Sequence, residues 1–149
     1  AELTAGLERR HERRSRLLGH EPAVSSSPTK RERELGALVP TVASDVPGTG
    51  YRFMNFYEKV LDPETIASFD LAPNFDYTHY GYMKARNLID GRRSILEIWE
   101  TAMAELWSAG YPEPHDVSLE EVARYMRFLE VAEYVTIGPA PRADAAARR

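Results

Sequence analysis

Two segments of this chain carry the same helix-start signature, and this pair constrains the fold more than any other feature of the sequence. Ser94 is followed three residues later by Glu97, and Ser118 is followed three residues later by Glu121. This is the spacing of a capping box, in which the serine and glutamate side chains accept hydrogen bonds from free backbone N–H groups at a helix start. We therefore predict two helices that begin at these serines.

Apolar residues recur at three- and four-residue steps after each serine, which is typical of a helix with one buried face. The predicted core positions are Ile95, Ile98, Trp99, Ala102, Met103 and Leu106, then Leu119, Val122, Tyr125, Met126 and Leu129. A third helical pattern covers residues 77–89 and stops at Asp90-Gly91, where glycine can adopt a left-handed conformation. Residues 134–137 form a β-branched run bounded by Gly138-Pro139, which predicts a strand.

The order of these elements predicts a mainly α protein. Residues 77–137 are expected to form a three-helix winged-helix-like domain with a short terminal strand. We expect an N-terminal helix and linker at 1–35, an extended, irregular aromatic arm at 36–76 and a disordered tail at 138–149. Within the arm, Asp62-Pro63 is typical of a helix start, because proline fits the first helical position.

Composition excludes several classes of protein. The chain has 149 residues, of which 43% are hydrophobic and 28% charged, and its net charge is −4. The absence of cysteine excludes disulfides, thiol catalysis and thiolate metal sites, and is consistent with a cytoplasmic protein. No apolar run of about 18 residues is present, so we predict no membrane span. The first residue is Ala1 rather than Met, and we expect the chain to be a piece of a longer protein.

The sequence contains no set of residues that we would assign to catalysis. Its histidines are His11, His20, His79 and His115, and none forms the closely spaced pair that a helical metal site would use. Phosphate-binding glycine loops and nucleophilic serine turns are also missing. We predict no metal, no cofactor and no catalytic residue in this chain.

The segments 87–106 and 117–137 resemble a known domain. The matching residues are Asn87, Asp90, Gly91, Arg93, Ser94, Glu97 and Ile98 in the first segment, and the second carries a V-x-x-Y-M-x-x-L-E-x-A-x-x-V pattern from Val122. They resemble the C-terminal winged-helix-like domain that follows the catalytic domain of some bacterial zinc aminopeptidases. The layout is also similar to the peptide chaperone of pyrroloquinoline quinone biosynthesis.

The aminopeptidase resemblance implies a non-catalytic accessory domain for docking or self-association, with any activity belonging to a separate peptidase domain. The chaperone resemblance implies a peptide-binding module, for which residues 134–137 would be the natural strand edge. A winged helix could also bind DNA. The third helix, however, places Arg124 and Arg127 outward among Glu120, Glu121, Glu130 and Glu133, a mixed and net acidic surface that disfavours nucleic acid.

The aromatic arm predicts an interface. Its many large apolar side chains must be buried, since soluble monomers rarely expose large apolar patches. We expect a homo-oligomer with Phe53, Phe56 and Tyr57 near the interface, together with Tyr80 from the first helix of the domain. The competing outcome is an arm folded back on its own chain, which would give a compact monomer.

Overall fold

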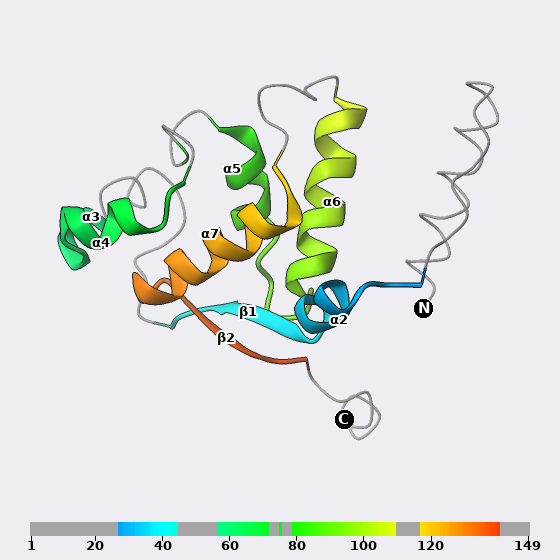
Figure 1. Ribbon diagram of the computed structural model, residues 1–149, viewed down its shortest axis with the longest axis horizontal. Coiled ribbons are helices and arrows are strands. Elements are labelled where there is room, and N and C mark those ends of the chain that lie inside the picture. The colour runs from blue at the N-terminus through cyan, green and yellow to red at the C-terminus, as the bar shows by residue number, and fades with distance from the viewer. Residues whose placement is uncertain (1–26, 45–56, 72–74, 76–78, 110–116, 141–149) are drawn as a thin grey trace.

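The computed structural model describes residues 27–44, 57–71, 75, 79–109 and 117–140 (Figure 1). The helices in these ranges are α2 (Lys30–Gly36), α3 (Tyr57–Val60), α4 (Pro63–Ser68), α5 (Tyr80–Asn87), α6 (Ile95–Ser108) and α7 (Leu119–Val131). Two strands, β1 (Leu38–Val42) and β2 (Val135–Pro139), form an antiparallel sheet. The predicted mainly α architecture with a short terminal strand is confirmed, while the winged-helix assignment stays a prediction.

Both predicted capping boxes are present. The Ser94 hydroxyl accepts from the Glu97 backbone N–H at 3.3 Å, and the Glu97 carboxylate accepts from the Ser94 N–H at 2.8 Å. Ser118 and Glu121 form the same pair of bonds at 3.2 and 2.7 Å. A further capping box, in which Thr29 begins α2, was not predicted from the sequence. These caps fix where three of the helices begin.

The turn between α5 and α6 differs in detail from the expectation. Helix α5 spans eight residues and ends at Asn87, three residues before Asp90. Gly91 does have a left-handed φ of 70°, but it lies in the following turn, where Asp90 accepts from the backbone of Arg92 and Arg93. A Cβ at Gly91 would lie only 3.3 Å from the hydroxyl of Thr41. Glycine thus lets this turn pack closely on β1.

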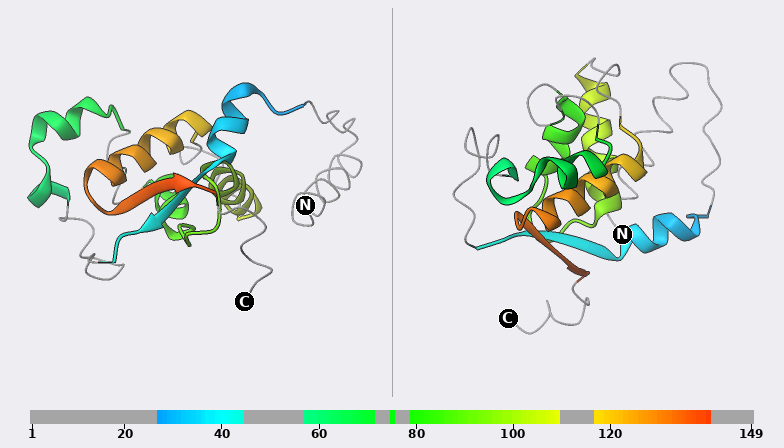
Figure 2. Two further views of the ribbon diagram at one scale, coloured as in Figure 1. Left: turned by 90° about the horizontal axis from the view of Figure 1, so that it is seen from below. Right: turned by 60° about the vertical axis from the view of Figure 1, so that its left-hand side comes forward.

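The sheet joins two distant parts of the sequence. Strand β1 pairs with β2 from Leu38 opposite Pro139 to Val42 opposite Val135. Figures 1 and 2 show the two strands side by side beneath the helices. The terminal strand was predicted, but β1 lies in the segment expected to be an irregular arm. Residues from that segment therefore complete the sheet of the helical domain.

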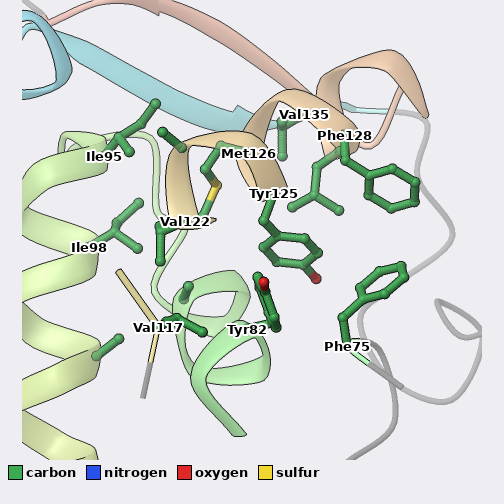
Figure 3. Packing of buried hydrophobic residues seen from close by; sticks show 14 of the residues in the cluster. Phe75, Tyr82, Ile95, Ile98, Val117, Val122, Tyr125, Met126, Phe128 and Val135 are labelled. Atoms are coloured by element: carbon green, nitrogen blue, oxygen red, sulfur yellow. The ribbon is translucent and has the colours of Figure 1, made fainter. Parts of the chain in front are cut away.

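The core lies where α5, α6 and α7 meet the sheet. Val122 and Met126 on α7 face Ile95 and Ile98 on α6, whereas Tyr125 and Phe128 point toward Tyr82 and Phe75 (Figure 3). The predicted core positions are buried, except that Trp99 and Leu119 are half-buried. The Trp99 indole N–H donates to the carbonyl of Val117 at 2.8 Å, which connects α6 to the start of α7.

Helices α3 and α4 form a short lobe beside α7 (Figure 1). Asp62 caps α4 and Pro63 occupies its first position, as predicted. The rings of Tyr57 and Phe69 pack edge-on against Phe128, with centroids 5.2 and 5.4 Å apart. The lobe is therefore attached to the core by aromatic contacts. Of the segment 1–35, predicted as a helix and linker, residues 1–26 lie outside the described residues. Of the tail predicted at 138–149, Gly138 and Pro139 belong to β2, and residues 141–149 lie outside the described residues.

Candidate functional site

The four predicted interface residues differ in whether the structure describes them and in how exposed they are. Phe53 and Phe56 lie outside the described residues. Tyr57 is only 5% exposed, because its ring packs against Phe75 and Phe128 of its own chain. Tyr80 is 45% exposed at the start of α5. The structure thus leaves Tyr80 partly exposed and turns Tyr57 inward, and the interface itself stays a prediction.

Metal-binding chemistry has no visible basis in the described ranges. Within them, no three His, Cys, Asp or Glu side chains gather in a way that could hold a metal ion. His79 is the one histidine in these ranges, and its ring lies 4.8 Å from the ring of Tyr82. The Glu100 carboxylate on α6 lies near those of Glu97, on the same helix, and Glu32, on α2. Burial, followed by repulsion from the other two, raises the pKa of Glu100.

An open groove of about 580 Å³ lies along α7. Its apolar lining comes from six different parts of the fold: Leu35, Leu38, Phe69, Ile95, Ala123 and Ile137. Five charged side chains complete it: Arg31, Glu120, Arg124, Arg127 and Glu130. We refer to these eleven residues as the α7 groove. Ile95 and Ala123 are buried at its base, and Ala123 is the smallest side chain in the lining.

The charged residues of the groove form ion pairs that fix its ends and rim. At the start of α7, Arg31 makes a two-point contact with Glu120, Nε to Oε1 at 2.8 Å and Nη2 to Oε2 at 2.9 Å. Hydrogen bonding to Arg31 lowers the pKa of Glu120, and the same contact raises the pKa of Arg31. This bridge connects α2 to α7 and closes one end of the groove.

The other two arginines are held more loosely. Arg124 donates to the Asp70 carbonyl at 3.0 Å and approaches its carboxylate at 3.4 Å, but the Asp70 side chain is 96% exposed. Arg127 pairs with Glu130 one turn further along α7, and its own side chain is 68% exposed. Exposed pairs of this kind contribute only about 0–1 kcal/mol to stability. Both guanidinium groups can therefore exchange partners at little cost.

The outer edge of β2 forms one margin of the groove. The Ala43 N–H donates to the Tyr134 carbonyl and the Ala140 N–H to the Ala37 carbonyl, one bond at each end of the register. Hydrogen-bonded and non-hydrogen-bonded pairs alternate in antiparallel sheets, so Ile137 presents its backbone away from β1. Its N–H donates to Glu130 Oε1 at 3.2 Å.

Both strands carry proline on the edge that faces away from the partner strand. The same alternation turns the backbones of Pro40 and Pro139 outward, and proline has no N–H to donate. Together with the bond from Ile137 to Glu130, this removes donors that an incoming strand would need. The arrangement disfavours strand addition at residues 134–137, the edge on which the peptide-chaperone alternative relied.

Sequence reasoning identified the charged face of α7 but not the groove. The outward positions of Glu120, Arg124, Arg127 and Glu130 follow from helical periodicity. Arg127 pairs with Glu130 on the same helix, whereas Glu120 and Arg124 have partners far away in the sequence, on α2 and after α4. No local pattern signals those contacts, so the pairing of Arg31 with Glu120 required the structure.

The lining of the groove offers contacts for binding. Its apolar base can bury side chains, and its arginines and glutamates can form ion pairs and hydrogen bonds. No helix within the described ranges is both long enough and apolar enough to cross a bilayer. Comparison with models of protein families, with curated proteins and with solved structures finds no match to this chain.

Proposed function

We propose that this chain is a non-catalytic interaction domain that docks a segment of another protein in the α7 groove. The observation that carries the proposal is the groove itself, an open space of about 580 Å³ with an apolar base and a charged rim. Apolar contacts at the base supply binding free energy, and the polar rim supplies orientation. Its two loosely held arginines can turn toward a bound partner without breaking the core.

The sequence resemblance gives this proposal a biological setting. If the chain is the C-terminal part of a zinc aminopeptidase-like protein, the docked segment would belong to the peptidase domain or to a second subunit. Support for this parent protein comes from the resemblance alone, which rests on Asn87, Asp90, Gly91, Arg93 and Ser94. Self-association through Tyr80, Phe53 and Phe56 remains part of the same proposal, and its test is the mass of the protein in solution.

DNA binding is less well supported than protein docking. A phosphate-binding face gains affinity from arginine and lysine side chains that neutralise phosphates. The outward face of α7 offers a DNA duplex two arginines, Arg124 and Arg127, which are too few for a run of phosphate contacts. The first turn of α7 adds Glu120 and Glu121, which would repel the phosphate backbone.

The test of the docking function uses a variant that fills the groove. Ala123→Trp places a large ring over the base, and Ala104→Trp, at an exposed position on α6, is the matched control. A display library of random 16-residue peptides is selected against the immobilised full chain, and each enriched peptide is then measured against all three proteins. Thermal unfolding confirms that both variants are folded.

We expect enriched peptides to bind the wild type and Ala104→Trp equally and to lose binding to Ala123→Trp. The proposal is overturned if no peptide is enriched, or if the enriched peptides bind Ala123→Trp as well as the wild type. In the second case the docking surface lies elsewhere on the chain.

A further inference from the structure

We propose that the segment docked in the α7 groove is an acidic, amphipathic helix of a partner protein. This inference rests on the docking function proposed above and specifies the chemistry of the partner. It follows from three properties of the groove, namely the backbone groups at its margin, its length along α7, and the balance of charge in its lining.

The margin of the groove disfavours an extended partner that would add as a strand. An added strand needs regularly spaced N–H donors and carbonyl acceptors on the edge it joins. At the margin formed by β2, the Ile137 N–H is already bonded to Glu130 and Pro139 has none to offer. A helix satisfies its own backbone hydrogen bonds, so it can occupy the groove without any from β2.

The length of the groove fits a short helix. Its lining on α7 runs from Glu120 to Glu130, ten residues at about 1.5 Å each, or about 15 Å. A helix of about ten residues has this length and presents two or three apolar side chains at i, i+3 and i+7. These can reach Ile95 and Ala123 at the base, with Leu35 and Ile137 at the sides.

Charge complementarity selects an acidic helix. The lining holds three arginines and two glutamates, so it is net positive on a chain whose net charge is −4. Arg124 and Arg127 are neighbours at i, i+3 on α7, and their present partners are exposed or on the same helix. A carboxylate on the partner can replace Asp70 at Arg124 and join Glu130 at Arg127. A basic helix would gain neither contact.

The experiment uses three synthetic peptides of 16 residues, each with leucines at i, i+3 and i+7. The first carries glutamates on its polar face, the second carries lysines at the same positions, and the third is the acidic peptide with a central proline that breaks the helix. Binding to the full chain is measured by fluorescence anisotropy at two salt concentrations. The charge-reversed variant Arg124→Glu/Arg127→Glu tests the contacts, and Arg92→Glu, exposed outside the groove, is its control.

We expect the acidic peptide to bind the wild type and Arg92→Glu, and to bind about tenfold more weakly to Arg124→Glu/Arg127→Glu, with affinity falling as salt rises. The proline peptide should bind more weakly than its parent, and the lysine peptide should bind the charge-reversed variant better than the wild type.

Two results overturn the inference while leaving the docking function intact. One is groove-dependent binding, lost in Ala123→Trp, that favours the lysine peptide on the wild type. The other is equal binding of the proline peptide, which would show that no helix is needed. Absence of any groove-dependent binder among these peptides and the random library overturns the docking function itself.

Discussion

The two sides of α7 are built by different physical means. On one side Tyr125 and Phe128 are buried in a cluster of aromatic rings, with Phe128 in edge-on contact with Tyr57, Phe69 and Phe75. On the other side, small Ala123 lies between charged residues whose partners are mostly exposed. One helix therefore has a side that fixes the fold and a side that remains open to solvent.

This difference between the two sides of α7 indicates where residues can be substituted without unfolding the chain. Buried aromatic pairs combine a large hydrophobic contribution with about 0.5–1.5 kcal/mol of ring–ring attraction each. Exposed ion pairs contribute about 0–1 kcal/mol and exchange readily. Substitutions on the aromatic side should therefore alter stability, whereas substitutions on the groove side should mainly alter recognition.

The largest expected effect comes from Phe128→Ala. Removing this fully buried ring should lower the free energy of unfolding by about 3–5 kcal/mol, because a cavity replaces contacts with four other rings. Urea denaturation measures the loss, and Phe128→Leu should give a smaller one. The neighbouring exposed Arg127→Ala should change stability by less than about 0.5 kcal/mol. Similar losses for Phe128→Ala and Arg127→Ala would contradict the contrast between the two sides.

A change at the start of α7 should affect both sides together. Ser118→Ala removes the hydroxyl that accepts from the Glu121 N–H, and should cost about 0.5–2 kcal/mol. The control is Ser108→Ala at the exposed end of α6, where we expect less than about 0.5 kcal/mol. An unchanged urea midpoint for Ser118→Ala would show that the capping box does not set the start of this helix.

A smaller loss of stability is expected from Glu130, at the margin of the groove formed by β2. Glu130→Ala leaves the Ile137 N–H without its acceptor and should cost about 0.5–1.5 kcal/mol. Glu130→Gln keeps a carbonyl oxygen at that position, so its loss should be smaller. Hydrogen exchange at the Ile137 amide reports the same bond directly and should accelerate only in Glu130→Ala. Equal exchange rates in all three proteins would argue against a protected edge.

The smallest effect concerns the bridge between Arg31 and Glu120. A double-mutant cycle with alanine at both positions should give a coupling of about 0.2–1 kcal/mol at pH 7. Because the folded-state pKa of Glu120 is below its ordinary 4.5, the bridge stabilises the fold above that value. The coupling should disappear as the pH falls through the lowered pKa. A coupling that persists at pH 2 would show that the carboxylate charge is not its source.

The helical part of the fold could be predicted because its signals are local. Ser94, Ser118 and Asp62 each satisfy N–H groups within three residues, so the sequence pattern and the structure report the same contact. The buried faces of α6 and α7 follow from 3.6-residue periodicity. Here the physical cause of the structure lies within a single turn of the chain.

Strand β1 and the groove could not be predicted because the contacts that form them join residues far apart in the sequence. Pro40 marks residues 38–42 as a poor strand, and the segment pairs only because β2 lies beside it and the missing N–H faces outward. The groove needs Arg31, Phe69, Glu120 and Ile137 from four separated segments to converge. The residue types can be read from the sequence, but the contact of these four segments in space cannot.

The pairing of β1 with β2 also sets an order of events during synthesis. Val42 pairs with Val135, so α3 to α7 lie between the two strands in the sequence. Closing so long a loop costs more entropy than packing successive helices, whose contacts span short stretches of chain. On the ribosome β1 emerges before α3 to α7 and must wait for residues 135–139, which follow α7. The sheet is therefore completed only after the helices have been made, and until then the nascent chain exposes an unpaired strand to chaperones.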